Sequence, residues 1–412
     1  MKFFRCCLPR FVFLFFSISL YFWAKPYEAF VIVPVVDILS RSCDGTAQER
    51  VKFYNNLPLS PVESSAYWPR IHQALFNETV WVIKEENGQA FVEMKNCFIL
   101  DEHYNKKEVQ GWVQLDDVYA TERAIKNRVQ YGFPAPIDYR KSAQIVRPTL
   151  VIYEPWFEDQ TQQIYSAGTR FIRAPQDDSE DFYAINLFDK SRHKLLKAFI
   201  GKRIAIIEEE RSQQQQQDLF LKILDTWCSY QLPIAYVFGG SSFCKLTSAQ
   251  AFLAPYCFGG KSFSCWNSAE YDQKVMSGLD CSGLLLRAAQ IAGMPYYFKN
   301  SLSILRGLKQ LGEEKSLSVG DLVWTKGHVG IVSALISPQF IEAAGYGRGY
   351  GKVHKIELKK RFLGAANWHD LLFSCFNHTV PTNINADGSL SQDNMPLVFL
   401  RLATLWDNGD VL

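Results

Sequence analysis

"DCSGLLLRAAQIAG", residues 280–293, is the stretch of sequence that decides the fold of this chain. The run predicts a helix, and Gly293 suits the position just after a helix C-terminus. Asp280 can cap the start of that helix, which places Cys281 at its N-terminus. A cysteine there faces the positive end of the helix dipole, and this favours the nucleophilic thiolate. We therefore expect a helix that carries a reactive cysteine.

Two later motifs supply partners for that cysteine. "GHVGIV" places His328 on a predicted strand, and "FIEAAG" places Glu342 on the next one. An imidazole near a thiol can hold the thiolate as an ion pair or take its proton, and a carboxylate can orient the ring. The backbone amide of Cys281 is a candidate oxyanion donor. Each residue alone is more often structural, but the three together predict catalysis by Cys281, His328 and Glu342.

The rest of the chain predicts an α+β protein. "TVWVIKEENGQAFVEM" indicates a hairpin with an Asn-Gly turn, and "DLFLKILDTWCSY" has the periodicity of an amphipathic helix. Four strands are predicted in "SVGDLVW", "HVGIVSAL", "QFIEAAG" and "VHKIEL". Two β units, over residues 30–130 and 145–210, precede this α+β segment, which we place at 211–361. A C-terminal extension, 362–412, shows no catalytic pattern.

Composition excludes some classes of function. The chain has 412 residues and a formal net charge of +2, which gives no signal for a nucleic-acid partner, because such binding needs a concentrated basic face. Residues 1–29 combine basic residues with a 14-residue apolar stretch at 11–24, which predicts a signal peptide or an uncleaved signal anchor. A buried N-terminal helix is the alternative. We expect a monomer exported to the periplasm or cell envelope, with membrane anchoring if the segment is retained.

The cysteines and a doubled motif leave one assignment open. "YVFGG" begins at Tyr236 and "YCFGG" at Tyr256, and either tyrosine could border the site. Tyr236 follows the amphipathic helix directly, so we favour it and expect an insertion over about 241–277, which Cys244, Cys257 and Cys265 could crosslink. The cysteines form no CxxC pair, and zinc between Cys281 and His328 would lack further ligands. We expect no metal and no cofactor.

These motifs resemble the NlpC/P60 cysteine peptidases of the cell wall. The resemblance rests on "YVFGG", "DCSGL", "GDLVW", "HVGIV" and "FIEAAGYGRG", and it covers roughly residues 218–358. It implies a papain-like catalytic domain with Cys281 as nucleophile and His328 as base. The third residue in that family is often His, whereas this chain has Glu342. The two β units resemble bacterial SH3-type (SH3b-like) barrels, an arrangement similar to dipeptidyl-peptidase VI or YkfC-like enzymes.

The resemblance to that branch implies a substrate and its contacts. Those enzymes cut after γ-D-glutamate in peptidoglycan stem peptides with a free N-terminal L-Ala, and they act in muropeptide recycling. Carried over, Asp280 would contact the free amine, while Ser282 and Ser301 would help hold the peptide and Tyr236 would border the pocket. A buried carboxylate at Asp280 would suit an ammonium group. The resemblance thus implies a γ-D-glutamyl–diamino acid endopeptidase.

Two other functions stay open at this point. A CHAP-like N-acetylmuramoyl-L-alanine amidase also pairs Cys and His with an acidic or amide residue, and Glu342 fits that pattern. A non-catalytic wall-binding protein is the second alternative, because SH3-type units bind wall polymers. The intact pair of Cys281 and His328 argues against the latter.

Overall fold

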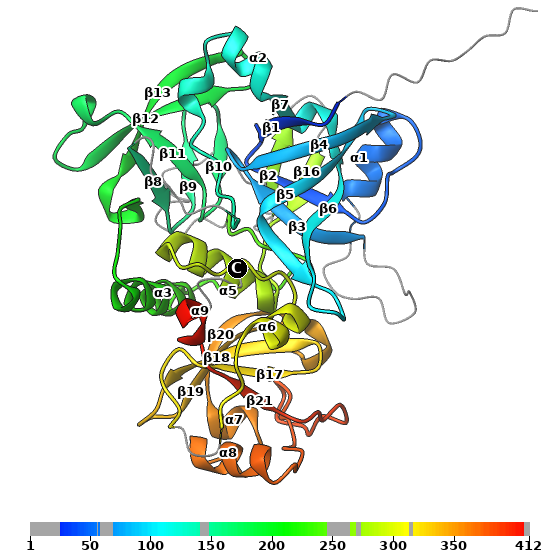
Figure 1. The fold of residues 1–412 in the computed structure, drawn as a ribbon, viewed down its shortest axis with the longest axis vertical. Coiled ribbons are helices and arrows are strands. Elements are labelled where there is room, and N and C mark those ends of the chain that lie inside the picture. Colours follow the sequence, from blue (N-terminus) through cyan, green and yellow to red (C-terminus); the bar gives the residue numbers. More distant parts are fainter. Residues whose placement is uncertain are drawn as a thin grey trace, which may run out of the picture.

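The computed structural model describes residues 25–55, 57, 69–140, 148–244, 264–268, 273–312 and 316–407. The chain is a mixed α and β protein with several antiparallel sheets. Two β units lie at one end, a third sheet lies at the other, and helices lie between them (Figure 1). The apolar stretch at 11–24 and the second motif at 256–260 fall outside the described residues. Among the helices described, none is long and apolar enough to cross a membrane.

The first β unit is a seven-stranded antiparallel sheet in the order β3-β2-β6-β5-β4-β1-β7. The Asn-Gly hairpin between β4 and β5 is confirmed, because Asn87 and Gly88 both have positive φ. The first described strand, β1, begins at Tyr27, three residues before the expected boundary at residue 30. Its elements are β1 (Tyr27–Val31), β2 (Val35–Leu39), α1 (Ala47–Asn55), β3 (Arg70–Leu75), β4 (Thr79–Glu86), β5 (Gln89–Leu100), β6 (Lys106–Gln114), β7 (Val118–Ala120) and α2 (Thr121–Lys126).

The second β unit is a five-stranded sheet in the order β13-β12-β11-β8-β14, with the small β10-β9 pair beside it. Its strands are β8 (Thr149–Ile152), β9 (Trp156–Glu158), β10 (Gln163–Tyr165), β11 (Arg170–Arg173), β12 (Phe182–Asp189), β13 (Lys194–Gly201) and β14 (Ala205–Ile207). The interpretation of either unit as an SH3-type barrel stays a prediction.

The helices and strands expected after residue 211 are present. α3 (Gln213–Cys228) begins in the glutamine run, where Ser212 and Gln215 form a reciprocal capping box. α5 (Cys281–Ala292) ends at Gly293, which has φ 77° as a C-terminal glycine should. The third sheet has the order β20-β19-β18-β17-β21. Its strands are β17 (Leu322–Thr325), β18 (His328–Ala334), β19 (Gln339–Ala344), β20 (Lys352–Glu357) and β21 (Val398–Leu400).

The segment after residue 361 belongs to this third sheet. β21 pairs with β17, so the sheet does not end where the sequence placed the extension. The remaining elements are α6 (Ser301–Gly307), α7 (Leu358–Arg361), α8 (Trp368–Phe376) and α9 (Thr404–Asp407), together with a short hairpin of β15 (Ser264–Ser268) and β16 (Gln273–Met276). The C-terminal residues thus help to build the sheet that carries His328 and Glu342.

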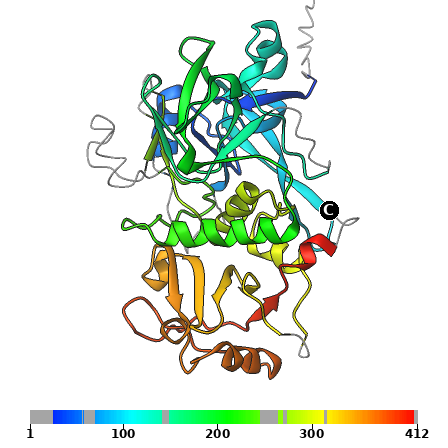
Figure 2. The ribbon, with the colours of Figure 1, turned by 90° about the vertical axis from the view of Figure 1, so that its left-hand side faces the viewer.

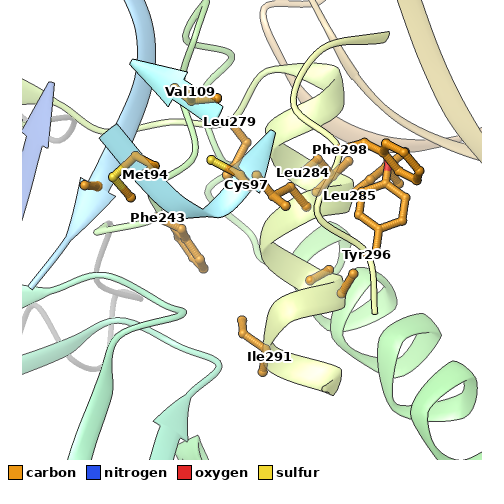
Figure 3. Close-up of a cluster of buried hydrophobic side chains, with 14 of the residues drawn as sticks. Met94, Cys97, Val109, Phe243, Leu279, Leu284, Leu285, Ile291, Tyr296 and Phe298 are labelled. Carbon is orange, nitrogen blue, oxygen red and sulfur yellow. The ribbon is translucent and has the colours of Figure 1, made fainter. Parts of the chain in front are cut away.

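The hydrophobic core runs without a break from the first β unit to α5. Figure 3 shows Met94, Cys97 and Val109 of the β unit facing Leu284 and other apolar side chains of α5. The same core continues through α3 to the third sheet. α3 and α5 therefore lie between the β units and that sheet (Figure 2). Because these parts share buried apolar area, they stabilise one another as a single packed unit.

Candidate active site

Cys281 is the first residue of α5, as the sequence predicts. Asp280 caps the helix, since its Oδ1 accepts the Gly283 N–H at 2.5 Å. Almost the whole helix is buried, including Arg287, which forms an ion pair of 2.6 Å with Glu78 in the first β unit. Cys281 therefore starts a helix that is fixed at its cap and is also bound to the first β unit through Arg287.

The loop that begins with "YVFGG" is pressed against this helix. A Cβ atom on Gly283 would lie 2.0 Å from the carbonyl oxygen of Gly240, so only glycine permits the approach. The next two residues bind β3: the Ser241 N–H donates to Gln73 Oε1 at 3.1 Å, and the Ser242 hydroxyl donates to the same atom at 2.7 Å. The loop thus fixes the helix start relative to the first β unit.

The Cys281 side chain is buried and its thiol is protonated at rest. Burial raises its pKa to about 12, and the Asp280 charge adds to that effect. The backbone N–H groups of Val329 and Ser282 donate to the sulfur and oppose the shift. Burial thus favours the neutral thiol of Cys281, in opposition to the thiolate that its place at the helix N-terminus favours. The Val329 contact also shows that Cys281 lies against the start of β18, which is His328.

His328 and Glu342 form the pair that the sequence predicts. His328 begins β18 and Glu342 lies on β19, where it is paired with Gly330 in the sheet register. The His328 Nε2 atom lies 2.6 Å from Glu342 Oε2. Because a carboxylate accepts the Nε2 proton, Nδ1 is the unprotonated nitrogen and can act as the base. Burial lowers the pKa of His328, while the hydrogen bond and charge of Glu342 oppose that shift.

Glu342 is the centre of a buried charged cluster. It is fully buried, and Arg361 of α7 contacts both of its oxygens, through Nε at 2.6 Å and Nη2 at 3.3 Å. His354 of β20 lies across the sheet from Glu342 and places Nε2 3.1 Å from Oε1. Burial alone would raise the pKa of Glu342, but Arg361 and the two histidines hold it well below its usual value. Glu342 is therefore a carboxylate at neutral pH.

Arg361 and His354 were not among the residues singled out in the sequence. A lone strand histidine such as His354 is more often structural, and Arg361 ends a basic run, "KKR", which resembles a solvated face. Only the antiparallel register of β19 and β20 brings His354 opposite Glu342. Arg361 in turn is held by Asn383 of the C-terminal segment. The Arg361 Nη1 group donates a hydrogen bond to Asn383 Oδ1 at 2.7 Å.

Of the four residues expected to contact a substrate, Asp280 caps α5, and the other three also lie within the described residues. Tyr236 lies near Cys281: burial raises the pKa of Tyr236 first, and the neighbouring Cys281 and Asp280 side chains raise it further. The Ser282 hydroxyl is buried and donates to Asp280 Oδ1 at 2.9 Å. Ser301 begins α6, and its carbonyl accepts the Trp324 indole N–H at 2.8 Å. Their contacts with a substrate stay a prediction.

Tyr256 and the cysteines that were expected to crosslink the insertion lie partly outside the described residues. Tyr256 and Cys257 lie outside the described residues, as does the side chain of Cys265. Cys244 is buried and forms a disulfide. Tyr236 is near Cys281, and its assignment as the tyrosine that borders the site stays a prediction. Within the described ranges, no group of three or more His, Cys, Asp or Glu side chains is arranged to hold a metal ion.

Comparison with known proteins yields structural likeness only. No family model and no curated protein matches the sequence. An NlpC/P60 family protein from Bacillus cereus superposes with a TM-score of 0.52 at 13% identity, covering 80% of this chain and 94% of that one. The chain has the fold of that NlpC/P60 family protein.

Two further solved structures match more loosely than the Bacillus cereus NlpC/P60 protein. NlpC1 from Trichomonas vaginalis has a TM-score of 0.30 at 14% identity, covering 82% of this chain and 89% of that one. The peptidoglycan hydrolase RipB from Mycobacterium tuberculosis has a TM-score of 0.22 at 20% identity, covering 36% and 60%. Neither superposes closely enough to define a shared fold.

The hydrogen bond between His328 and Glu342 can be tested by titration of the histidine ring. We expect the His328 ring to titrate below pH 6.5, because burial disfavours its charged form. In Glu342→Gln the midpoint should fall further, because the carboxylate that favours the imidazolium is gone while Arg361 remains. Ring-proton NMR, with His328→Gln to assign the resonance, measures both values. A midpoint that rises in Glu342→Gln would contradict this account of the site.

Proposed function

We propose that this protein is a thiol hydrolase that cleaves an amide bond by way of Cys281. The observation that carries the proposal is the Val329 N–H on the Cys281 sulfur, which puts the nucleophile at the start of the strand whose first residue is His328. Glu342 lies 2.6 Å behind that imidazole. A nucleophile, a base and a residue that orients the base are the parts of a catalytic triad.

The resting protonation states define the first step. A neutral thiol and a neutral imidazole mean that His328 Nδ1 takes the thiol proton as the sulfur attacks the carbonyl carbon. The imidazolium that forms is stabilised by the Glu342 carboxylate, which Arg361 keeps charged. The Cys281 backbone N–H is the candidate donor to the developing oxyanion.

The later steps return the enzyme to its starting state. The C–N bond breaks as His328 donates its proton to the leaving amine, and the acyl group remains on sulfur as a thioester. Water then attacks the thioester while His328 accepts a proton, which releases the carboxylic acid and restores the thiol. Every step uses only groups of this chain and water.

The substrate that we propose is a peptidoglycan stem peptide, cut between γ-D-glutamate and the diamino acid. The motif set around Cys281, His328 and Glu342 and the NlpC/P60 fold support it. Export to the cell envelope would bring the enzyme to this substrate. The first β unit packs directly on the helix that carries Cys281, so it is placed to shape the peptide site.

Digestion of muropeptides tests the reaction. We expect disaccharide-tripeptide to yield a free diamino acid and a disaccharide that keeps L-Ala-γ-D-Glu, as measured by mass spectrometry. Release of an intact stem peptide from the sugar would identify the CHAP-like amidase instead. No product from any muropeptide, with wall polymer still bound, would favour the non-catalytic wall-binding protein.

A further inference from the structure

The carboxylate next to the nucleophile already has a cation. Asp280 Oδ2 accepts a hydrogen bond from Lys299 Nζ at 3.0 Å, and the two side chains are 10% and 4% exposed. On the other oxygen, Oδ1 accepts the Gly283 N–H and the Ser282 hydroxyl. A carboxylate has about four acceptor positions, so most of those on Asp280 are in use. The charge that was expected to receive a substrate ammonium is therefore neutralised within the chain.

Lys299 is held in this place by the backbone. The Lys299 N–H donates to the Phe98 carbonyl at 2.8 Å, and the Phe98 N–H donates to the Tyr297 carbonyl at 2.9 Å. Phe298 and Phe98 form a parallel bridge, and their rings pack at 5.2 Å. Because β5 of the first β unit holds the backbone of Lys299 and the lysine side chain is buried, the ammonium is kept close to Asp280. Its ammonium is a built-in counterion to Asp280.

A second side chain beside Asp280 is also a hydrogen-bond donor. Tyr296 is fully buried, and its hydroxyl has no hydrogen-bond partner among the described residues. Burial raises its pKa first, and the neighbouring Cys281 and Asp280 side chains raise it further, so the hydroxyl keeps its proton. A neutral phenol and an ammonium donate hydrogen bonds to carbonyl oxygens, whereas a second ammonium beside Lys299 would be repelled.

We infer that the enzyme takes stem peptides whose amino end is amide-linked, and that it does not select a free N-terminal ammonium. This inference rests on the proposed endopeptidase function and departs from the preference for free L-Ala that the sequence implied. Such a preference needs a free carboxylate, and the Asp280 carboxylate is already paired with Lys299. An acylated alanine has a carbonyl oxygen in place of the ammonium, and this oxygen can accept a hydrogen bond from Lys299 or Tyr296. The peptide would thus be cut while still attached to its sugar.

A pair of matched peptides tests the inference. L-Ala-γ-D-Glu-meso-diaminopimelate and its N-acetyl form differ only in the charge of the amino end. We expect the wild type to cleave the acetylated peptide with a kcat/KM equal to or higher than that of the free peptide. A free peptide cleaved more than about tenfold faster would overturn the inference while leaving the endopeptidase intact. Cleavage of neither peptide would overturn the proposed function itself.

Two variants of Lys299 separate its charge from its packing. Lys299→Met removes the counterion, so Asp280 is free to attract an ammonium. The ratio of free to acetylated kcat/KM should then rise by about tenfold or more. Lys299→Arg keeps the ion pair and should keep the wild-type ratio. Both kcat/KM values are measured on one preparation, so a misfolded fraction lowers both equally and leaves their ratio unchanged. An unchanged ratio in Lys299→Met would contradict the inference.

Discussion

Replacing Cys281 with alanine is expected to abolish hydrolysis of the stem peptide, with a loss of at least about 10⁴-fold in kcat. The residual rate reflects substrate positioning alone, because the acyl-enzyme cannot form. Liquid chromatography of the released diamino acid measures the rate. The melting temperature should change little, because Asp280, which caps α5, is unchanged and alanine is compatible with the first helical position.

Cys375→Ala provides the matched control for this result. Cys375 is a free, partly buried thiol on α8, and it takes no part in the site described here. That variant should hydrolyse the peptide at the wild-type rate. Turnover in Cys281→Ala within about tenfold of wild type would remove Cys281 as the nucleophile and with it the proposed reaction.

Replacing Arg361 with methionine is expected to lower the free energy of unfolding by about 3–5 kcal/mol, because it leaves a buried carboxylate without its cation. Arg361 and Glu342 are 1% and 0% exposed, so water cannot take over the lost contacts. Methionine keeps much of the apolar volume of the arginine stem, which separates the loss of charge from a loss of packing. Urea denaturation at pH 7 measures the change.

The double variant Arg361→Met with Glu342→Gln should recover part of that stability, because a neutral amide needs no counterion. Lys360→Met is the control, since Lys360 is the exposed neighbour of Arg361 on α7 and should leave unfolding unchanged. A loss below about 1 kcal/mol in Arg361→Met would show that the cluster does not depend on this arginine.

Local sequence signals predicted most of the elements near the site. The helix at α5 could be predicted because cap, apolar run and final glycine agree within 14 residues. The strands that carry His328 and Glu342 could be predicted from their alternation, and so could the hydrogen bond between the two residues once the strands were paired. The amphipathic helix α3 was equally clear, since its apolar stripe has a helical period.

Contacts set by long-range packing could not be predicted. Lys299 meets Asp280 because the chain turns back along β5 after α5, and nothing in the residues between them encodes that path. Arg361 lies at the end of a basic run and reaches the core only through the geometry of α7. The resting thiol was also missed, because burial of Cys281 depends on β18 and on the loop after α3. These are the contacts that set charge in the site.

The position of β21 in the third sheet affects the order in which the candidate site is assembled. The helix that carries Cys281 is synthesised well before β21, the last strand of the sheet that carries His328 and Glu342, and Asn383, which holds Arg361, also follows late. A nascent chain therefore has its thiol and its imidazole before it has the residues that fix the carboxylate behind them. The carboxylate of the proposed triad is thus fixed in place only after β21 and Asn383 have been synthesised.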